Sequence, residues 1–254
     1  ILSSLKENQI ATGDIIQVEG RTTLTKIRFF GSRESLLDRS QILLQADKGP
    51  NEELDPSISE SLTKTALTNV PDSCALVISD YDKGVVTNDG AQQLIQSAKK
   101  SGIPIIVDPK LTGLEKSRGA TVVIFEKRGM TLLARRMGLE NDAAATKLLE
   151  DYSWDGILVL GGIHGMHLHQ KDTESIFMPC MAPTAEQQIG MHDAAAASLA
   201  AALGSGLTLY DASLLASAAC DCVLSASSGR DYIDRATLGL WLDELSWQLR
   251  ISDR

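Results

Sequence analysis

The chain has 254 residues, 43% of them hydrophobic and only 4% aromatic, which is enough to bury the core of one large domain. Its formal net charge is −9, from 24 basic against 33 acidic residues, and this balance disfavours direct binding to nucleic acid or to an anionic membrane. The sequence contains no run of about 18 apolar residues, so no membrane span is expected.

The first predicted element is a hairpin over residues 15–30, with its turn near Glu19 and Gly20, which would form a lid or an edge ribbon. The alternation of polar and apolar residues is clearest in its second strand. The segment 45–63 is polar and contains proline, which predicts a surface loop.

Four short apolar runs are typical of strands that are buried on both faces of a parallel sheet. They read CALVIS (74–79), IPIIVD (103–108), ATVVIF (120–125) and GILVLG (156–161). A helix between the first two begins at Asn88 or Asp89 and ends at Gly102, and a further helical stretch separates the last two. This alternation predicts a doubly wound α/β layer fold.

The rest of the chain predicts one more hairpin and three helices. The hairpin covers 165–180 and turns at 171–173. The helices cover 193–204, 208–227 and 234–254. The last helix is amphipathic, and we expect its apolar side to pack on its own domain rather than on a partner.

The cysteines form no CxxC pair and have no histidine at ligand spacing, which predicts reduced core residues in a reducing compartment such as the cytoplasm or an organelle matrix. They are Cys74, Cys180, Cys220 and Cys222. His167 and His169 would share one strand face without a third ligand at suitable spacing, so ordinary strand histidines are favoured over a metal site. The chain begins with Ile1 and has no secretory signal pattern, and we expect a segment upstream of it.

Three short motifs follow one another along the chain: SDYDKG at 79–84, VDPK at 107–110 and GMHD at 190–193. In this order they resemble the PfkB/ribokinase family of sugar kinases, and specifically its heptose-phosphate kinase branch. Two earlier segments, 21–28 and 34–39, resemble strands of that branch. The resemblance implies one domain over 1–254, an α/β/α three-layer sandwich with a mainly parallel sheet and a small β lid. It also implies that the family's N-terminal strands precede this sequence.

The resemblance further implies ATP and Mg²⁺ as the phosphate donor system and a sugar hydroxyl as the acceptor. Asp193 would take the proton from that hydroxyl, and the amides that follow Gly190 would cradle the transferring phosphate. Lys110 would lie near a nucleotide or sugar phosphate. The nucleotide loop of the family corresponds to a stretch with three glycines: Gly161, Gly162 and Gly165.

The same residues have purely structural interpretations, which the sequence leaves open. Asp193 can be the N-cap of the helix that follows it. Asp80 and Lys83 can belong to a loop that closes one strand and caps the next helix. Asp108 and Lys110 can form a strand-end turn that the intervening proline fixes.

Several positions depart from the motifs of the family. The departures are Met191 and His192 in place of two small residues, Glu126-Lys127-Arg128-Gly129 in place of an N-x-x-E motif, Leu160 in place of a threonine, and Gln187 in place of an acid. His192 is expected to occupy part of the space of the phosphate and to pair, when protonated, with Asp193 or a neighbouring acid.

Loss of a single oxyanion-type donor lowers a rate by about 10²–10³, so several losses predict little turnover. We therefore favour a pseudokinase that needs no cofactor and acts as a structural or regulatory subunit, in a larger assembly or a homo-oligomer. Two alternatives stay open. One is an active ATP- and Mg²⁺-dependent kinase of a sugar or sugar phosphate. The other is a module that binds a nucleotide or metabolite without transferring phosphate.

Overall fold

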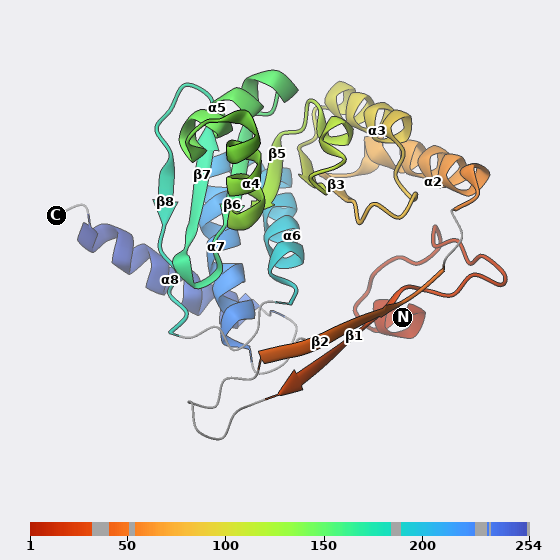
Figure 1. Cartoon of the computed structure of the whole chain (residues 1–254), viewed down its shortest axis with the longest axis horizontal. Helices are drawn as coiled ribbons and strands as arrows, with labels where there is room; N and C mark the ends of the chain where they lie inside the picture. The colour runs from red at the N-terminus through yellow and green to blue at the C-terminus, as the bar shows by residue number, and fades with distance from the viewer. Residues whose placement is uncertain (32–40, 51–53, 184–188, 227–232, 234, 253–254) are drawn as a thin grey trace.

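The computed structural model describes the chain apart from residues 32–40, 51–53, 184–188, 227–232, 234 and 253–254. Its centre is a six-stranded sheet in the order β3-β4-β5-β6-β7-β8 (Figure 1). The strands are β3 Leu76–Ser79, β4 Ile105–Asp108, β5 Val122–Glu126, β6 Gly156–Leu160, β7 Met166–Gln170 and β8 Ile176–Met178. The first four are parallel, and β7 pairs antiparallel with both β6 and β8.

The four apolar runs of the sequence form β3 to β6, which are neighbours in the sheet as predicted. Alternate residues of each strand point to opposite faces. In β5, Val123 and Phe125 join one core cluster, whereas Val122 and Ile124 join the other. Strands that are apolar on both faces require cover on both faces, and this is why the pattern predicts a layered fold.

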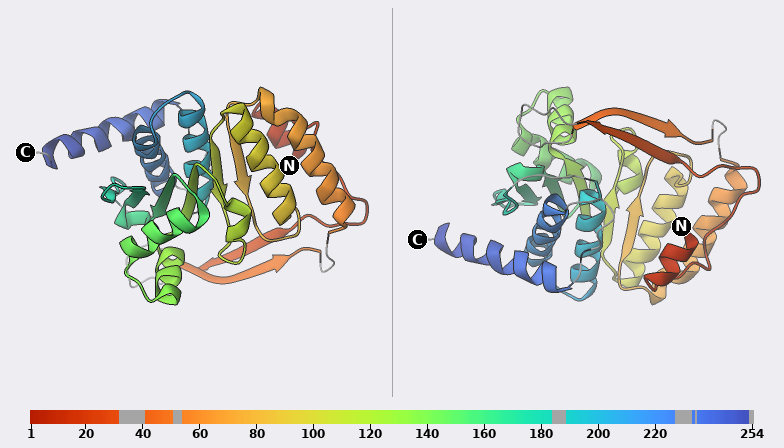
Figure 2. Two further views of the ribbon diagram at one scale, coloured as in Figure 1. Left: turned by 90° about the horizontal axis from the view of Figure 1, so that it is seen from above. Right: turned by 90° about the horizontal axis from the view of Figure 1, so that it is seen from below.

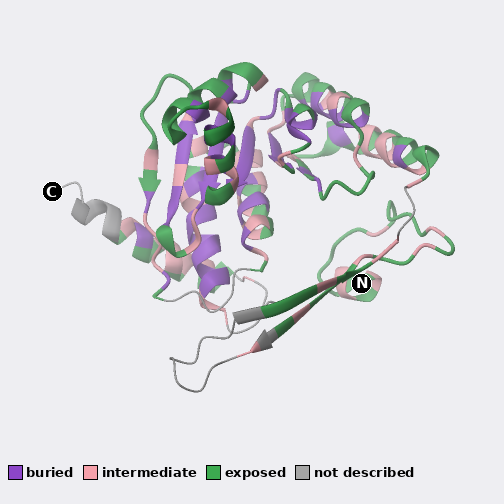
Figure 3. Ribbon diagram, in the orientation of Figure 1, coloured by how far each residue is buried: buried purple, intermediate pink, exposed green. Residues whose placement is uncertain are grey.

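Helices cover both faces of the sheet (Figure 2). One face carries α3 (Asn88–Ser101), α4 (Lys127–Met137) and α5 (Asn141–Tyr152). The other face carries α6 (Met191–Gly204) and α7 (Leu209–Ser225). Figure 3 shows the buried residues concentrated in these three layers. The predicted three-layer α/β/α sandwich is confirmed.

The structure describes five further helical segments. They are α1 Leu2–Glu7, α2 Pro56–Asn69, and three 3-10 helices at Val70–Asp72, Leu114–Ser117 and Gly162–His164. The start predicted for α3 at Asn88 is confirmed, because the hydroxyl of Thr87 accepts the Gly90 amide at 3.0 Å and caps the helix there. Gly102, with φ +68°, ends it in the left-handed conformation that glycine favours.

Two long strands outside the sheet form an antiparallel ribbon, β1 (Thr25–Gly31) with β2 (Gln41–Lys48). The hairpin predicted over 15–30 is wrong, since its first half forms no strand and its second half pairs with β2. Gly20 does bend the chain, with φ +73°, but β1 finds its partner further along the sequence. The segment 34–39 lies outside the described residues.

The surface loop predicted over 45–63 is also wrong. β2 extends to Lys48, and α2 begins at Pro56. Oδ1 of Asp55 accepts a hydrogen bond from the Ser57 amide at 2.9 Å, and this contact caps the helix. The polar composition of the segment suggested a loop, although the sequence contains a helix start signal, an aspartate followed by a proline.

For the C-terminal part of the chain, the predicted hairpin and helices agree with the structure in kind and in position. The hairpin of β7 and β8 and the helices α6 and α7 lie where they were predicted. The last helix, α8 (Arg235–Ser252), packs on α7 and buries Leu245 completely, while Leu240 and Trp247 stay exposed. In the part of the chain that the structure describes, no helix is long and apolar enough to cross a membrane.

All four cysteines are free thiols. Cys220 and Cys222 are buried and Cys180 is half-buried, but Cys74 is exposed, so the prediction that it is a core residue is wrong. The reason is its position just before β3, the strand at one edge of the sheet.

Candidate functional site

The carboxyl ends of β3 and β4 meet the beginning of α6, and the ribbon of β1 and β2 lies across this end of the sheet (Figure 1). Ligands of α/β folds bind at the carboxyl ends of parallel strands. The chain after β3 brings Tyr81 to this place, and the chain after β4 brings Lys110. The first turn of α6 adds His192, which contacts Asp108 at the end of β4.

Gly190 is the N-cap of α6, with φ +93°, and no side chain caps this helix. The interpretation of Asp193 as the N-cap is therefore wrong, because it is the third residue of the helix. Its carboxylate is exposed and has no hydrogen bond or ion pair with another described residue. A negative charge in the first turn is favourable, and the amides of this turn remain available to an anion.

An ion pair joins the first turn of α6 to the end of β4. Nδ1 of His192 lies 3.1 Å from Oδ1 of Asp108, and the two side chains are only 26% and 19% exposed. Burial disfavours the charged imidazole, but the hydrogen bond and charge of Asp108, with Glu126 and Asp193 nearby, outweigh it and raise the pKa of His192. The predicted pairing of His192 with an acid thus takes the form of a contact with Asp108.

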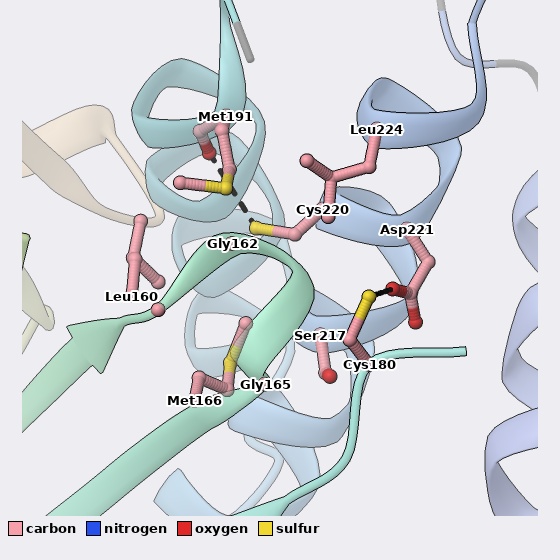
Figure 4. A pocket seen from close by; sticks show the side chains of 11 residues that line it. Leu160, Gly162, Gly165, Met166, Cys180, Met191, Ser217, Cys220, Asp221 and Leu224 are labelled. Atoms are coloured by element: carbon pink, nitrogen blue, oxygen red, sulfur yellow. Dashed lines mark hydrogen bonds between the residues drawn. The ribbon is translucent and has the colours of Figure 1, made fainter. Parts of the chain in front are cut away.

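Met191 points into the core beside the predicted nucleotide loop. With Gly161, Gly162 and Gly165 it lines a cavity of about 10 Å³, the size of a single water molecule (Figure 4). Met191 itself is 6% exposed. A long apolar side chain therefore stands where the family has a small residue.

The glycines of the loop are required by its backbone. The amide of Gly161 donates to the carbonyl of Gly165 at 2.8 Å, which closes a tight turn between β6 and β7. Gly165 has φ +73°, and a Cβ atom there would collide with the Met178 carbonyl. The structure thus gives these glycines a turn-forming role, and it brings the loop next to the start of α6.

Asp221 of α7 lies buried beside the same cavity, and no motif of the sequence pointed to it. Its Oδ1 accepts the Cys180 thiol at 3.0 Å and the Met181 amide at 3.2 Å. Burial raises the pKa of Asp221, and burial together with this carboxylate raises the pKa of Cys180 to about 12. This contact ties the strand end after β8 to α7 and leaves Cys180 a poor nucleophile.

Asp80 serves the loop rather than a ligand. Its side chain is 3% exposed and forms an ion pair with Nζ of Lys116 at 2.6 Å, and its Oδ1 accepts the Asp82 amide at 2.9 Å. The interpretation that this loop closes a strand is correct, but the cap of the next helix is Thr87. Lys116 was missed because only the fold brings it to Asp80.

Lys83 lies in a different hollow of the surface. It is exposed and lines an open groove of about 1400 Å³ beside the N-terminal segment and α2. The structure does not bring Lys83 together with Asp193. Gln187, the other departure near the phosphate turn, lies outside the described residues.

Tyr81 is flanked by two lysines from different segments. Nζ of Lys110 lies 5.1 Å from the centre of the ring, and Nζ of Lys26, on β1, lies 5.6 Å from it. Burial and the carboxylates of Asp193 and Asp108 raise the pKa of Tyr81, with burial the larger cause. Lys110 was expected near a ligand from its motif, whereas neither Tyr81 nor Lys26 was expected there.

His167 and His169 share one face of β7, as predicted. Their rings stack 6.2 Å apart, and Nδ1 of His169 lies 3.5 Å from a carboxylate oxygen of Asp142. Burial lowers the pKa of His169 despite this carboxylate. Among the residues described by the structure, no three His, Cys, Asp or Glu side chains are grouped so that they could hold a metal ion.

The turn before α6 fits the ATP and Mg²⁺ of the family only in part. Its open amides suit an anion. The side chain of Met191 is packed against the nucleotide loop, and His192 is already engaged with Asp108.

Known proteins resemble this chain both in sequence and in fold. The bifunctional protein HldE of Escherichia fergusonii is 32% identical over 214 residues, which are 83% of this chain and 42% of HldE. HldE of Shigella flexneri matches with the same identity and coverage. The chain therefore spans less than half the length of the curated relatives it matches. No protein-family model matches the chain.

Solved structures show the same fold. Phosphofructokinase-2 from Escherichia coli in complex with potassium has a TM-score of 0.66 at 19% identity, over 80% of this chain and 67% of that one. A nucleoside kinase of Burkholderia thailandensis in complex with inosine has a TM-score of 0.64 at 15% identity, over 96% and 76%. Ribokinase of Arabidopsis thaliana complexed with ribose and ATP has a TM-score of 0.60 at 16% identity, over 78% and 65%.

The fold is that of PfkB/ribokinase-type kinases. Within that family the chain belongs to the heptose-kinase branch, as a homologue of HldE. The resemblance that three motifs carried in the sequence is thereby confirmed.

Proposed function

We propose that this chain is a kinase-like domain, over 1–254, whose phosphoryl-transfer site is closed, and that it acts as a structural or regulatory subunit. The observation that supports this proposal is the contact of His192 with Asp108 across the start of α6. In the family this turn cradles the transferring phosphate, and here a side-chain pair spans it. Met191 supports the same conclusion, because it is buried against the nucleotide loop.

The decisive experiment is a calorimetric titration of the chain with an ATP analogue, with and without Mg²⁺. The parent is compared with the double variant Met191→Ala, His192→Gly, which restores small residues to the turn. We expect weak or undetectable binding by the parent and stronger binding by the variant. Equal affinity in both would refute the idea that these two side chains close the site.

A turnover assay completes this test. With ATP, Mg²⁺ and a panel of sugars and sugar phosphates, we expect phosphate transfer by the parent to stay below the ordinary enzyme range of about 1–10³ per second. A turnover number within that range on any member of the panel would refute the proposal.

A second candidate function is an active ATP- and Mg²⁺-dependent kinase of a sugar or sugar phosphate. One observation favours it: Asp193 is retained in the first turn of α6 with an exposed carboxylate that no described residue engages. Such a carboxylate can accept a proton from a hydroxyl. In that case Asp193→Asn would abolish turnover while leaving nucleotide affinity unchanged.

The partners of a silent kinase subunit would be other protein chains or further copies of this one. Among related folds, phosphofructokinase-2 of Escherichia coli has a tetrameric inhibited form. Four free cysteines suit a reducing compartment such as the cytoplasm or an organelle matrix. Light scattering of the purified chain, and its purification with bound partners, would test this part of the proposal.

A further inference from the structure

Helix α4 presents an exposed leucine that is surrounded by arginines. Leu132 is 41% exposed, and the three exposed arginines stand four residues before it and three and four residues after it. Side chains at these spacings are neighbours on a helix surface. The helix contains no acid. Its outer side is thus a cationic surface with an apolar centre, here called the α4 face: Arg128, Leu132, Arg135 and Arg136.

Helix α8 presents the opposite combination. Leu240 is 71% exposed and Trp247 is 62% exposed. The exposed acids Asp243 and Glu244 lie between them, each three or four residues from both. The other side of the helix, with Leu245, is buried. The outer side is therefore an acidic surface between two large apolar side chains, here called the α8 face: Leu240, Asp243, Glu244 and Trp247.

The fold does not use the charges of either face. Among the residues that the structure describes, the ion pairs involve none of the three arginines of the α4 face and neither acid of the α8 face. Arginine and tryptophan are also the side chains that most often dominate the binding energy of protein interfaces. Both faces thus have the composition of a contact surface.

One copy of the chain cannot bring the two faces together. α4 packs on α5, β5 and β6, on one side of the sheet, whereas α8 packs on α7, which covers the other side. In both views of Figure 2 the C-terminal end of α8 extends beyond the layers that carry it. The α8 face is therefore accessible to another molecule.

We infer that the α4 face of one copy of this chain binds the α8 face of a second copy. Three guanidinium groups would meet two carboxylates, and Leu132 would meet the exposed leucine and tryptophan. A second copy is favoured because the complementary surface is present on the chain itself. A nucleic acid would match the arginines but not Leu132, and the net charge of −9 opposes its approach.

The arrangement sets the kind of assembly that results. Two different faces form a head-to-tail contact, which produces a closed ring or an open chain of copies. A contact between two helices is smaller than a standard interface of about 1,600 Å², so we expect weak association, with a dissociation constant of about 1–100 µM. The inference goes beyond the proposed function, because it holds whether or not the chain transfers phosphate.

The test is sedimentation velocity of the full chain over about 1–200 µM, which spans the expected dissociation constant. At about 0.02 M salt the average sedimentation coefficient should rise with concentration. At about 0.5 M salt it should fall back toward that of the monomer, because exposed charges are screened. Emission of the exposed Trp247 should shift to shorter wavelength as the copies associate.

Charge reversal of each face tests the pairing directly. Arg135→Glu, Arg136→Glu and, separately, Asp243→Lys, Glu244→Lys should each weaken self-association about tenfold or more, because like charges then meet. An equimolar mixture of the two variants should regain the association of the parent, since each reversed face then meets the reversed face of the other variant. Only a contact between these two faces on different copies predicts this rescue.

The matched control is Lys64→Glu, Lys100→Glu, which makes the same change of net charge at exposed positions of α2 and α3. It should associate like the parent. Leu132→Ser tests the apolar centre without changing any charge, and it should also weaken association. Urea unfolding of every variant checks that the fold is kept, as expected for exposed side chains.

Four results would overturn the inference. They are a chain that stays monomeric at every concentration, self-association that survives either charge reversal, a mixture of the two variants that does not associate, and loss of association in the control. Binding of an oligonucleotide that Arg135→Glu, Arg136→Glu abolishes, without self-association of the parent, would assign the α4 face to a nucleic acid instead. Since no arm contains ATP or a sugar, these results are independent of whether the phosphoryl-transfer site is closed.

Discussion

The pair of His192 and Asp108 should make the stability of the protein depend on pH in a direction set by the structure. The pKa of His192 is raised in the folded chain, whereas in the unfolded chain an imidazole titrates near pH 6.5. The stabilising contribution of the pair is therefore complete below about pH 6.5 and is lost as the pH rises through the higher folded pKa.

The size of this contribution follows from the exposure of the two side chains. Exposed ion pairs contribute about 0–1 kcal/mol, and buried hydrogen bonds to charged groups about 1.5–3 kcal/mol. The partners here are 26% and 19% exposed with a contact of 3.1 Å, which is between these cases. We expect a coupling free energy of about 1–2 kcal/mol near pH 5.5, falling toward zero in alkaline solution.

A double-mutant cycle isolates this coupling free energy from the other titrating groups. His192→Ala, Asp108→Asn and their combination are unfolded in urea at several pH values, and the free energies of unfolding are compared with the parent. The cycle is needed because His169 has a lowered pKa and gives the parent an opposite dependence. A coupling that is absent, or that does not decline as the pH rises, would refute the reasoning.

Three further predictions concern the fold. Lys116→Met removes one member of the buried ion pair with Asp80 and should lower the free energy of unfolding by about 3–5 kcal/mol. Adding Asp80→Asn should restore part of that free energy. A loss within about 0.5 kcal/mol of zero in urea unfolding would contradict this. His169→Phe should flatten the loss of stability that the parent suffers as the pH falls below about 6.5, because a buried imidazole with a lowered pKa resists protonation; thermal melts at several pH values measure it. Iodoacetamide at about pH 8 should modify exposed Cys74 rapidly and Cys180 slowly, since the pKa of Cys180 is raised to about 12; mass spectrometry of the labelled peptides would expose the opposite order.

The central sheet could be predicted from the sequence because its strands need cover on both faces. Runs such as 103–108 and 120–125 contain apolar residues at consecutive positions, and only a strand between two helical layers buries them all. The helix between β3 and β4 carries its own start and stop signals at Thr87 and Gly102. Local patterns of this kind require no knowledge of distant residues.

The ribbon and α2 could not be predicted, for two different reasons. Each residue of β1 pairs with a residue of β2 that lies ten or more positions further along the chain. The nearby glycine, Gly20, instead suggested a shorter hairpin with its turn at 19–20. An isolated pair of strands also shows a weaker pattern than a sheet strand, since both of its faces are largely exposed. For α2 the polar composition of the segment favoured a loop, although the sequence contains a local helix-capping signal, Asp55 followed by Pro56.

The residues of the candidate site also fall into those found from local motifs and those that only the fold brings together. Asp108 and Lys110 share one turn and were found together by their motif. The ion pair of Asp80 with Lys116 joins residues that are 36 positions apart in the sequence. Lys26 and Tyr81, which lie close together in the fold, are 55 positions apart (81 − 26). Contacts over such separations depend on the whole topology. One local signal was nevertheless available: cations at positions 26 and 28 share a strand face whenever the segment is a strand.

The two ends of the candidate site differ in their electrostatic character. At the start of α6 the imidazole of His192 lies 3.1 Å from a carboxylate oxygen of Asp108, which balances any positive charge on the ring, so the amides are the attraction that the turn keeps for an anion. Beside Tyr81 the positive charges have no described carboxylate partner. An anion is therefore attracted more strongly beside Tyr81 than at the start of α6, which is the imbalance that a closed phosphoryl-transfer site, as we propose, would leave.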